Sequence, residues 1–132
     1  MVKRKDAYKK LAAHDMVKRK DAYKKLIEAE LYALEDTKDF LKRMEEGEMR
    51  ELTPTLLQLR VVRRAYEIVD AIEKVLDERE EFREIYEKFY KKRRTWVRAC
   101  MEMHRSKSAF YTWRERLIER ICEELGLIEL KK

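Results

Sequence analysis

Residues that break helices are almost absent from this chain. Gly47, Pro54 and Gly126 are its only glycines and its only proline among 132 residues. Because glycine and proline disfavour a helix interior more than any other residue, their scarcity predicts long helices joined by short connections. Apolar residues make up 45% of the chain, which is enough to build a folded core. We therefore expect an all-α fold.

Two segments with helical periodicity flank the break around Gly47. The first runs from Asp21 to about Met44, and Lys38 interrupts its apolar stripe. Spacings of three, four and seven residues place the stripe on one face of a helix. The stripe consists of Tyr23, Ile27, Leu31, Leu34 and Leu41.

The second periodic segment starts with Thr53 as N-cap and Pro54 at the first helical position, and it carries a heptad seam that Glu73 would complete. The seam residues are Leu59, Val62, Tyr66, Val69 and Leu76. Two seamed helices joined by a short break predict an antiparallel hairpin. Apolar residues off the seam, such as Ile68 and Ile72, predict a wider interface. That interface is formed either with the C-terminal part or with another copy of the chain.

The C-terminal part begins with the spacing of a capping box. Asp77, with Glu80 three residues later, predicts the start of a third helix. Its apolar face consists of Phe82, Ile85, Tyr86 and Phe89. The basic run 91–94 ends this helix, and it is either a solvated helix end or a phosphate-binding patch.

A helix-turn-helix pattern follows the basic run. Thr95 is placed to cap a short helix that extends to about Met103, and a turn follows at 104–105. Ser106 is placed to cap a longer last helix, which Gly126 ends in a left-handed conformation. In this motif the second helix enters the major groove of DNA, with its N-terminal turns facing the base edges.

The spacing along the last helix separates an inward face from an outward face. We expect the inward face to form core rather than to stack on bases, and it consists of Ala109, Phe110, Trp113 and Leu117. The outward face carries groups that hydrogen-bond to base edges, namely Lys107, Ser108, Tyr111, Thr112 and Glu115. Surrounding arginines are expected to neutralise phosphates, namely Arg93, Arg94, Arg98, Arg105, Arg114 and Arg116.

The net charge of +6 conceals a strong segregation of charge along the chain. Residues 1–26 carry a net charge of +7, residues 27–90 carry −7, and residues 91–120 carry +7. A phosphate backbone is bound by local clusters of positive charge rather than by the total. The two basic blocks therefore favour double-stranded DNA as a partner.

One segment of the basic N-terminus is repeated. MVKRKDAYKKL at 1–11 recurs unchanged at 16–26, whereas solenoid repeats diverge and recur several times. We interpret residues 1–15 as a duplication or a cloning artefact, with Met16 as the original start. The alternative is a doubled basic arm that binds phosphates.

The helix-turn-helix segment carries features of a known family. These are Thr95 with Trp96, Ser106 with Ser108, the stretch 111–114 and the ending at 123–127. Over about 77–128 the chain resembles the RinA/ArpU-type phage late-gene transcriptional activators, which are similar to region 4 of sigma factors. The resemblance implies a sequence-specific transcriptional regulator that activates genes for packaging, morphogenesis or lysis. It also implies a bacterial host cytoplasm and RNA polymerase as a further partner.

Other functions have little support in the sequence. It contains no Gly-rich phosphate loop, zincin-type histidine pair or nucleophile elbow, so we expect no catalytic residue and no enzyme activity. Cys100 and His104 lack partners at ligand spacing, so we expect no metal or other cofactor. No apolar run approaches the roughly 18 residues that a membrane span needs. We therefore expect a cytoplasmic protein that does not contact a membrane.

These patterns divide the chain into three parts. We expect a duplicated basic arm at 1–15, a helical hairpin at 16–76 that forms oligomers, and a sigma region 4-like helix-turn-helix unit at 77–132 that binds DNA. The function that follows is transcriptional regulation. The alternative is a structural helical oligomer, or a phage packaging adaptor such as a small terminase subunit, with weak DNA binding.

Overall fold

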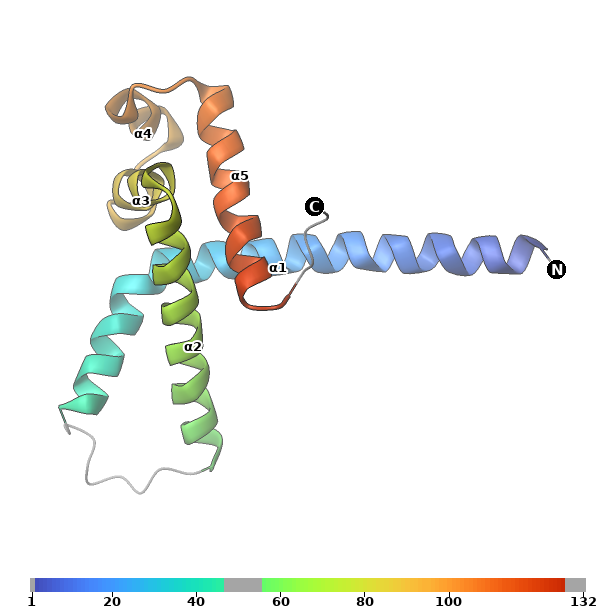
Figure 1. Cartoon of the computed structure of the whole chain (residues 1–132), viewed down its shortest axis with the longest axis horizontal. Helices are drawn as coiled ribbons and strands as arrows, with labels where there is room; N and C mark the ends of the chain where they lie inside the picture. The colour runs from blue at the N-terminus through green and yellow to red at the C-terminus, as the bar shows by residue number, and fades with distance from the viewer. Residues whose placement is uncertain (1, 47–55, 128–132) are drawn as a thin grey trace.

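The computed structural model describes the backbone of residues 2–46 and 56–127, and the side chains of residues 20–46 and 60–127. These residues form helices and turns only, so the fold is all-α, as predicted. The helices are α1 (Val2–Glu45), α2 (Leu56–Glu78), α3 (Glu80–Ile85), the π-helix η1 (Tyr86–Lys91), α4 (Trp96–Met103) and α5 (Lys107–Glu124). In Figure 1, α2 runs beside the C-terminal half of α1, and α5 returns from α4 to cross α1. Within the described ranges, no helix has the length and apolar character needed to cross a membrane.

Helices α1 and α2 form the predicted antiparallel hairpin. The Tyr66 hydroxyl of α2 donates a hydrogen bond to Glu45 near the end of α1, at 2.7 Å. The apolar stripe of α1 is also confirmed, because its residues face the core. Tyr23 is half-buried, and the buried members are Ile27, Leu31, Leu34 and Leu41.

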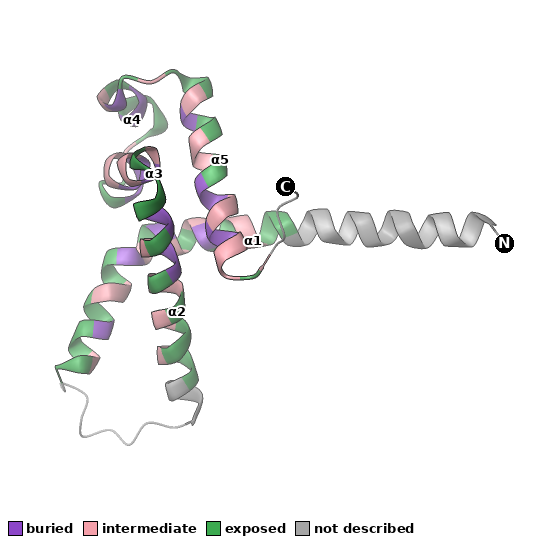
Figure 2. Cartoon of the chain, viewed as in Figure 1, coloured by how far each residue is buried: buried purple, intermediate pink, exposed green. Residues whose placement is uncertain are grey.

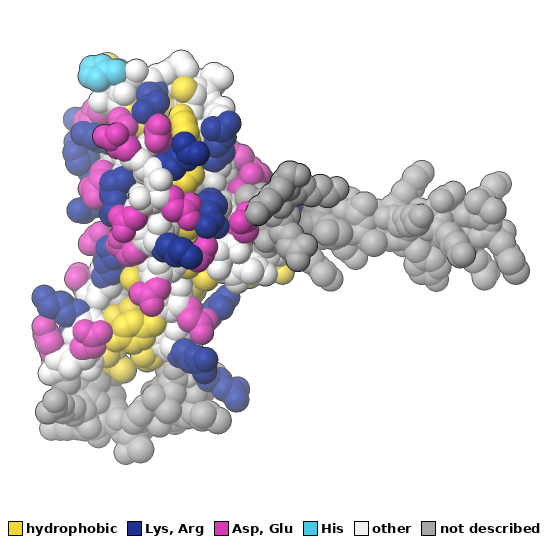
Figure 3. Space-filling view, in the orientation of Figure 1, with side chains coloured by type: hydrophobic (Ala, Val, Ile, Leu, Met, Phe, Trp, Pro, Cys, Tyr) yellow, Lys and Arg dark blue, Asp and Glu magenta, His cyan; other side chains and the backbone are white. Residues whose placement is uncertain are grey.

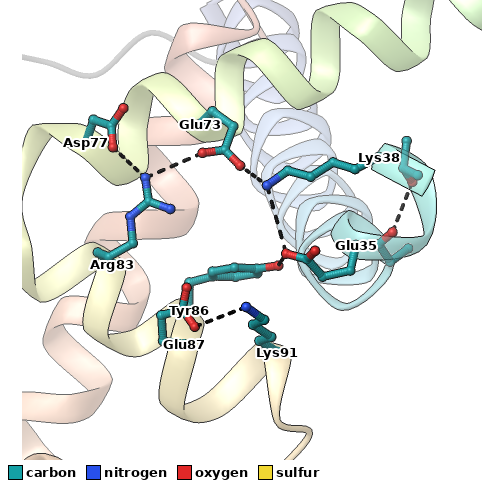
Figure 4. Close-up of polar contacts among 10 residues, drawn as sticks. Glu35, Lys38, Glu73, Asp77, Arg83, Tyr86, Glu87 and Lys91 are labelled. Carbon is teal, nitrogen blue, oxygen red and sulfur yellow. Dashed lines mark hydrogen bonds and ion pairs between the residues drawn. The ribbon is translucent and has the colours of Figure 1, made fainter. Parts of the chain in front are cut away.

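The two charged residues that interrupt the apolar patterns of this hairpin pair with each other. Lys38 of α1 forms an ion pair with Glu73 of α2 (Figure 4). Arg83 lies 3.4 Å from the Glu73 carboxylate, and Glu35 lies 3.9 Å from the Lys38 ammonium. The Lys38 and Glu73 side chains remain about one-third exposed. They therefore join the two helices without complete loss of hydration.

The buried face of α2 lies closer to its C-terminal end than the predicted seam. Val62, Tyr66 and Val69 are only half-buried, and the side chain of Leu59 lies outside the described residues. The buried residues of α2 are Ala71, Ile72, Val75 and Leu76. This half of α2 is covered by α5 as well as α1, with Lys74 2.6 Å from Glu124. The wider apolar interface of α2 is therefore formed with the C-terminal part.

The predicted helix start at Asp77 is wrong. Helix α2 continues through Glu78, and the Asp77 carboxylate pairs with Arg83 instead of capping a helix. Arg79 is the extended residue before α3, and its side chain makes no capping hydrogen bond. The ion pair with Arg83 satisfies the Asp77 carboxylate without a capping role. The expected cap at Thr53–Pro54 lies outside the described residues.

The π-helix η1 was not predicted. It continues α3 directly, and its wider turns bury Tyr86, Phe89 and Tyr90 together. The Tyr86 hydroxyl donates to Glu35 at 2.8 Å and the Tyr90 hydroxyl donates to Glu28 at 3.0 Å. Burial, reinforced by these carboxylates, raises the pKa of both tyrosines, so the hydroxyls remain protonated donors. These two hydrogen bonds link the π-helix to α1.

One apolar core joins all the helices. Figure 2 shows buried segments where α1, α2, α3 and α5 approach one another. Leu31 and Leu34 of α1 belong to the same buried cluster as Ile72 of α2 and Phe110 and Leu117 of α5. The predicted division after residue 76 therefore falls within α2 and between helices that share one core.

Candidate nucleic-acid interface

Helices α4 and α5 have the bounds and the caps that the sequence predicts. The Thr95 hydroxyl oxygen accepts a hydrogen bond from the Arg98 backbone N–H at 3.3 Å, and the Ser106 oxygen accepts from the Ala109 N–H at 3.1 Å. His104 has φ +52° and ends α4 in the left-handed conformation. The expected left-handed conformation at Gly126, φ +72°, is also confirmed.

The two predicted faces of α5 have the expected burial. Phe110 and Leu117 are fully buried, whereas Ala109 and Trp113 are half-buried. All members of the outward face are exposed, namely Lys107, Ser108, Tyr111, Thr112 and Glu115. The Thr112 hydroxyl donates to the Ser108 carbonyl at 2.9 Å, so its oxygen remains available as an acceptor. Contact of this face with DNA remains a prediction.

The sequence does not reveal that helix α1 lies beside the later turns of α5. Lys24 of α1 pairs with Glu115 and lies 3.5 Å from Glu119. The hydrogen bond to Glu115 raises the pKa of Lys24, although burial opposes this shift. A groove of about 360 Å³ separates the two helices, lined by Asp21, Lys24, Lys25, Glu28, Tyr111, Arg114, Glu115 and Ile118. Glu115 is therefore engaged by α1, which competes with its expected role at a cytosine.

Arg114 also has a different place from the one predicted. Its Nε atom lies 2.9 Å from the Glu28 carboxylate and 3.2 Å from the Tyr90 hydroxyl oxygen. Burial would lower the pKa of Arg114, but the hydrogen bonds to Glu28 and Tyr90 raise it overall. With its side chain only 23% exposed, Arg114 fastens α5 to α1 and η1. This geometry is that of an internal ion pair rather than of a free phosphate ligand.

The other arginines of the expected phosphate set fall into two groups. Arg94 pairs with Glu102, and Arg105 lies 3.5 Å from Glu84, so internal carboxylates partly neutralise both charges. Arg93, Arg98 and Arg116 are exposed. The Arg98 side chain is 68% exposed, and its Nε atom lies 3.9 Å from the Glu102 carboxylate. The Arg116 guanidinium lies over the Trp113 ring. The second group fits a phosphate-binding role better than the first.

Positive charge is concentrated just before α4. Lys91, Lys92 and Arg93 are exposed there. The charges of Arg94 and Lys88 lower the pKa of Lys92, as expected where cations crowd together. Such crowding favours the binding of an anion. On the face shown in Figure 3, by contrast, basic and acidic side chains alternate over the body of the molecule.

Comparison with known proteins adds nothing to this geometry. No protein-family model, no curated protein and no solved structure matches the chain. The function is therefore inferred from the residues and their positions.

Proposed function

We propose that the protein binds double-stranded DNA through the first two turns of α5 and regulates transcription. One observation carries the proposal. A row of exposed side chains able to hydrogen-bond lies on α5, opposite a buried apolar face, and a three-residue turn joins this helix to α4. In helix-turn-helix proteins the second helix contacts base edges from its N-terminal turns, and the first crosses the phosphate backbone.

Each group at this surface has a definite role in the proposal. Base edges are contacted by Lys107, Ser108, Tyr111 and Thr112. Phosphates are contacted by the exposed guanidinium groups, namely Arg93, Arg98 and Arg116. The later turns of α5 stay outside the major groove of the DNA, because α1 lies beside them.

The resemblance to phage late-gene activators supports a more specific role. On that basis, we propose activation of late genes with RNA polymerase as a partner. A second copy of the chain is a further partner, supported by apolar side chains on the outer part of the hairpin. Val61 is 56% exposed and Phe40 is 40% exposed.

The same apolar residues favour one alternative function. A structural helical oligomer, or a packaging adaptor with weak DNA binding, would use the hairpin as its main surface. Transcription assays on the source promoters would separate this alternative from an activator. An oligomer that leaves transcription unchanged would favour the adaptor.

The proposal is tested by measuring duplex affinity against salt concentration. Affinity should fall steeply, with a logarithmic slope of roughly −0.9 for each phosphate contact. Arg98→Ala should weaken all sequences alike and make the slope shallower by about one unit. Tyr111→Ala should instead reduce discrimination between cognate and random DNA by about 1–3 kcal/mol.

A matched control comes from the hairpin. Arg63 is 84% exposed on α2, far from α5 along the chain, so Arg63→Ala should leave both affinity and slope unchanged. Absence of duplex binding at low salt, or a response to salt that is flat, would contradict DNA binding. Altered sequence preference in Arg98→Ala but not in Tyr111→Ala would show that the reading face is misplaced.

A further inference from the structure

The N-terminal ends of α4 and α5 bring together an exposed group of aromatic and basic side chains. The rings of Trp96 and Tyr111 lie 6.2 Å apart between centroids and are tilted by 45°. The Lys107 ammonium lies 4.8 Å from the centroid of the Trp96 ring and 5.9 Å from that of Tyr111. Trp96 is 36% exposed and Tyr111 is 40% exposed, so neither ring is part of the closed core.

These rings restrict a side chain that is otherwise very flexible. An exposed lysine samples many rotamers, and a contact that fixes its ammonium must offset the loss of that freedom. The negative faces of the two rings attract the ammonium. They leave its N–H donors available, because an aromatic face is a much weaker acceptor than an oxygen or a ring nitrogen. Lys107 is therefore held in place while it keeps its hydrogen-bonding capacity.

The position of Lys107 limits what it can bind in a DNA complex. It is the first residue of α5, in the turn that reaches base edges in a helix-turn-helix protein. Guanine offers two acceptors, N7 and O6, on the edge that faces the major groove. Adenine offers one acceptor, N7, beside a donor, thymine offers one acceptor beside a methyl group, and cytosine offers a donor. Guanine is therefore the only base whose major-groove edge offers two acceptors side by side to a donor-only ammonium.

We infer that Lys107 selects a guanine in the target sequence by donating hydrogen bonds to N7 and O6. Trp96 is a positioning residue, which acts by holding the Lys107 ammonium over its ring. This inference rests on the proposed DNA-binding function, and it adds the identity of one base and a role for an exposed tryptophan. Trp96 contacts no base in this arrangement.

The test is selection of bound duplexes from a random library, using the full chain and four variants. Wild-type protein should select a site with guanine at a fixed position. Lys107→Met should lose preference at that position by about tenfold and keep the preferences elsewhere. Trp96→Leu should lose part of the same preference, and Trp96→Phe should restore it because a ring is present again. Met101→Leu, at a residue of α4 that is 71% exposed, is the matched control and should select the wild-type site.

The outcomes distinguish this inference from the proposed function. If the wild-type protein selects no sequence, both fail. If it selects a site but Lys107→Met keeps the guanine, or weakens every sequence equally, the guanine contact is wrong and the proposed sequence-specific DNA binding stands. If Trp96→Leu keeps full preference with normal helicity by circular dichroism, the positioning role is wrong. Lys107→Met changes an exposed side chain, so its result does not depend on the stability of the Trp96 variants.

Discussion

At the scale of single residues, the helix ends around the proposed interface share one backbone motif. The His104 N–H donates a hydrogen bond to the Met101 carbonyl, and the Arg105 N–H donates one to the Cys100 carbonyl. The same pair of bonds occurs at Arg93 and at Gly126, and all three residues have positive φ. This is the Schellman ending, which favours glycine because other residues are strained there. Only Gly126 could be predicted from sequence, since Arg93 and His104 carry no such signal.

This motif predicts opposite effects for two matched substitutions. His104→Gly should raise the free energy of unfolding by about 0.5–1 kcal/mol, because relief of strain outweighs the added freedom of the unfolded chain. Gly126→Ala should lower it by about 1 kcal/mol. A Cβ at Gly126 would meet no atom within 4 Å, so the effect comes from φ alone. Urea denaturation measures both, and shifts of the same sign would contradict the shared motif.

At the scale of elements, local signals predict the helices that begin at a capping side chain. Thr95 and Ser106 predict the starts of α4 and α5. Each cap accepts a hydrogen bond from a backbone N–H only three residues later, so the signal is local in sequence. The π-helix and the end of α2 could not be predicted this way. They depend on the hydrogen bond from Tyr90 to Glu28 and on the ion pair between Arg83 and Asp77. Such contacts form only in the folded chain.

The residues of the candidate site also divide into those that local sequence patterns predict and those that depend on distant partners. The exposed row on α5 follows from helical periodicity, and the structure confirms its exposure. The engagement of Arg114 by Glu28 and of Glu115 by Lys24 was missed, because those partners are 86 and 91 residues apart in sequence. Charge type alone does not tell a phosphate ligand from an internal ion pair.

The ion pair between α1 and α2 leads to a prediction at this scale. Lys38→Met and Glu73→Leu should each lower the free energy of unfolding by about 1 kcal/mol, because each leaves a half-buried charge without its main partner. The double variant should cost less than the sum, since both charges are then gone. The Arg63–Glu67 pair on α2 is the control, and its 84% exposed arginine should show coupling below about 0.5 kcal/mol. Strictly additive effects at Lys38 and Glu73 would show that the pair is energetically unimportant.

At the scale of the whole molecule, the proposed reading helix depends on the N-terminal half. Helix α5 packs against the core residues of α1 and α2, and ion pairs on its flanks tie it to both helices. The hairpin therefore supports α5 directly, beyond any role in forming oligomers. Changes in the hairpin should reach the proposed DNA-binding surface through this shared core.

The shared core predicts how fragments of the chain behave. Residues 77–132 alone would lose the α1 and α2 side chains of the shared core, which include Leu31, Leu34 and Ile72. Uncovering several large apolar side chains costs about 1.5–3 kcal/mol each, more than a unit of this size can lose. We expect this fragment to show weak helicity and no cooperative thermal unfolding by circular dichroism. A chain that starts at Met16 keeps every described side chain, and it should unfold at the same temperature as the full chain. Cooperative unfolding of residues 77–132 would instead establish an independent C-terminal domain, and a lower Tm for the chain from Met16 would assign a structural role to the first copy of the repeat.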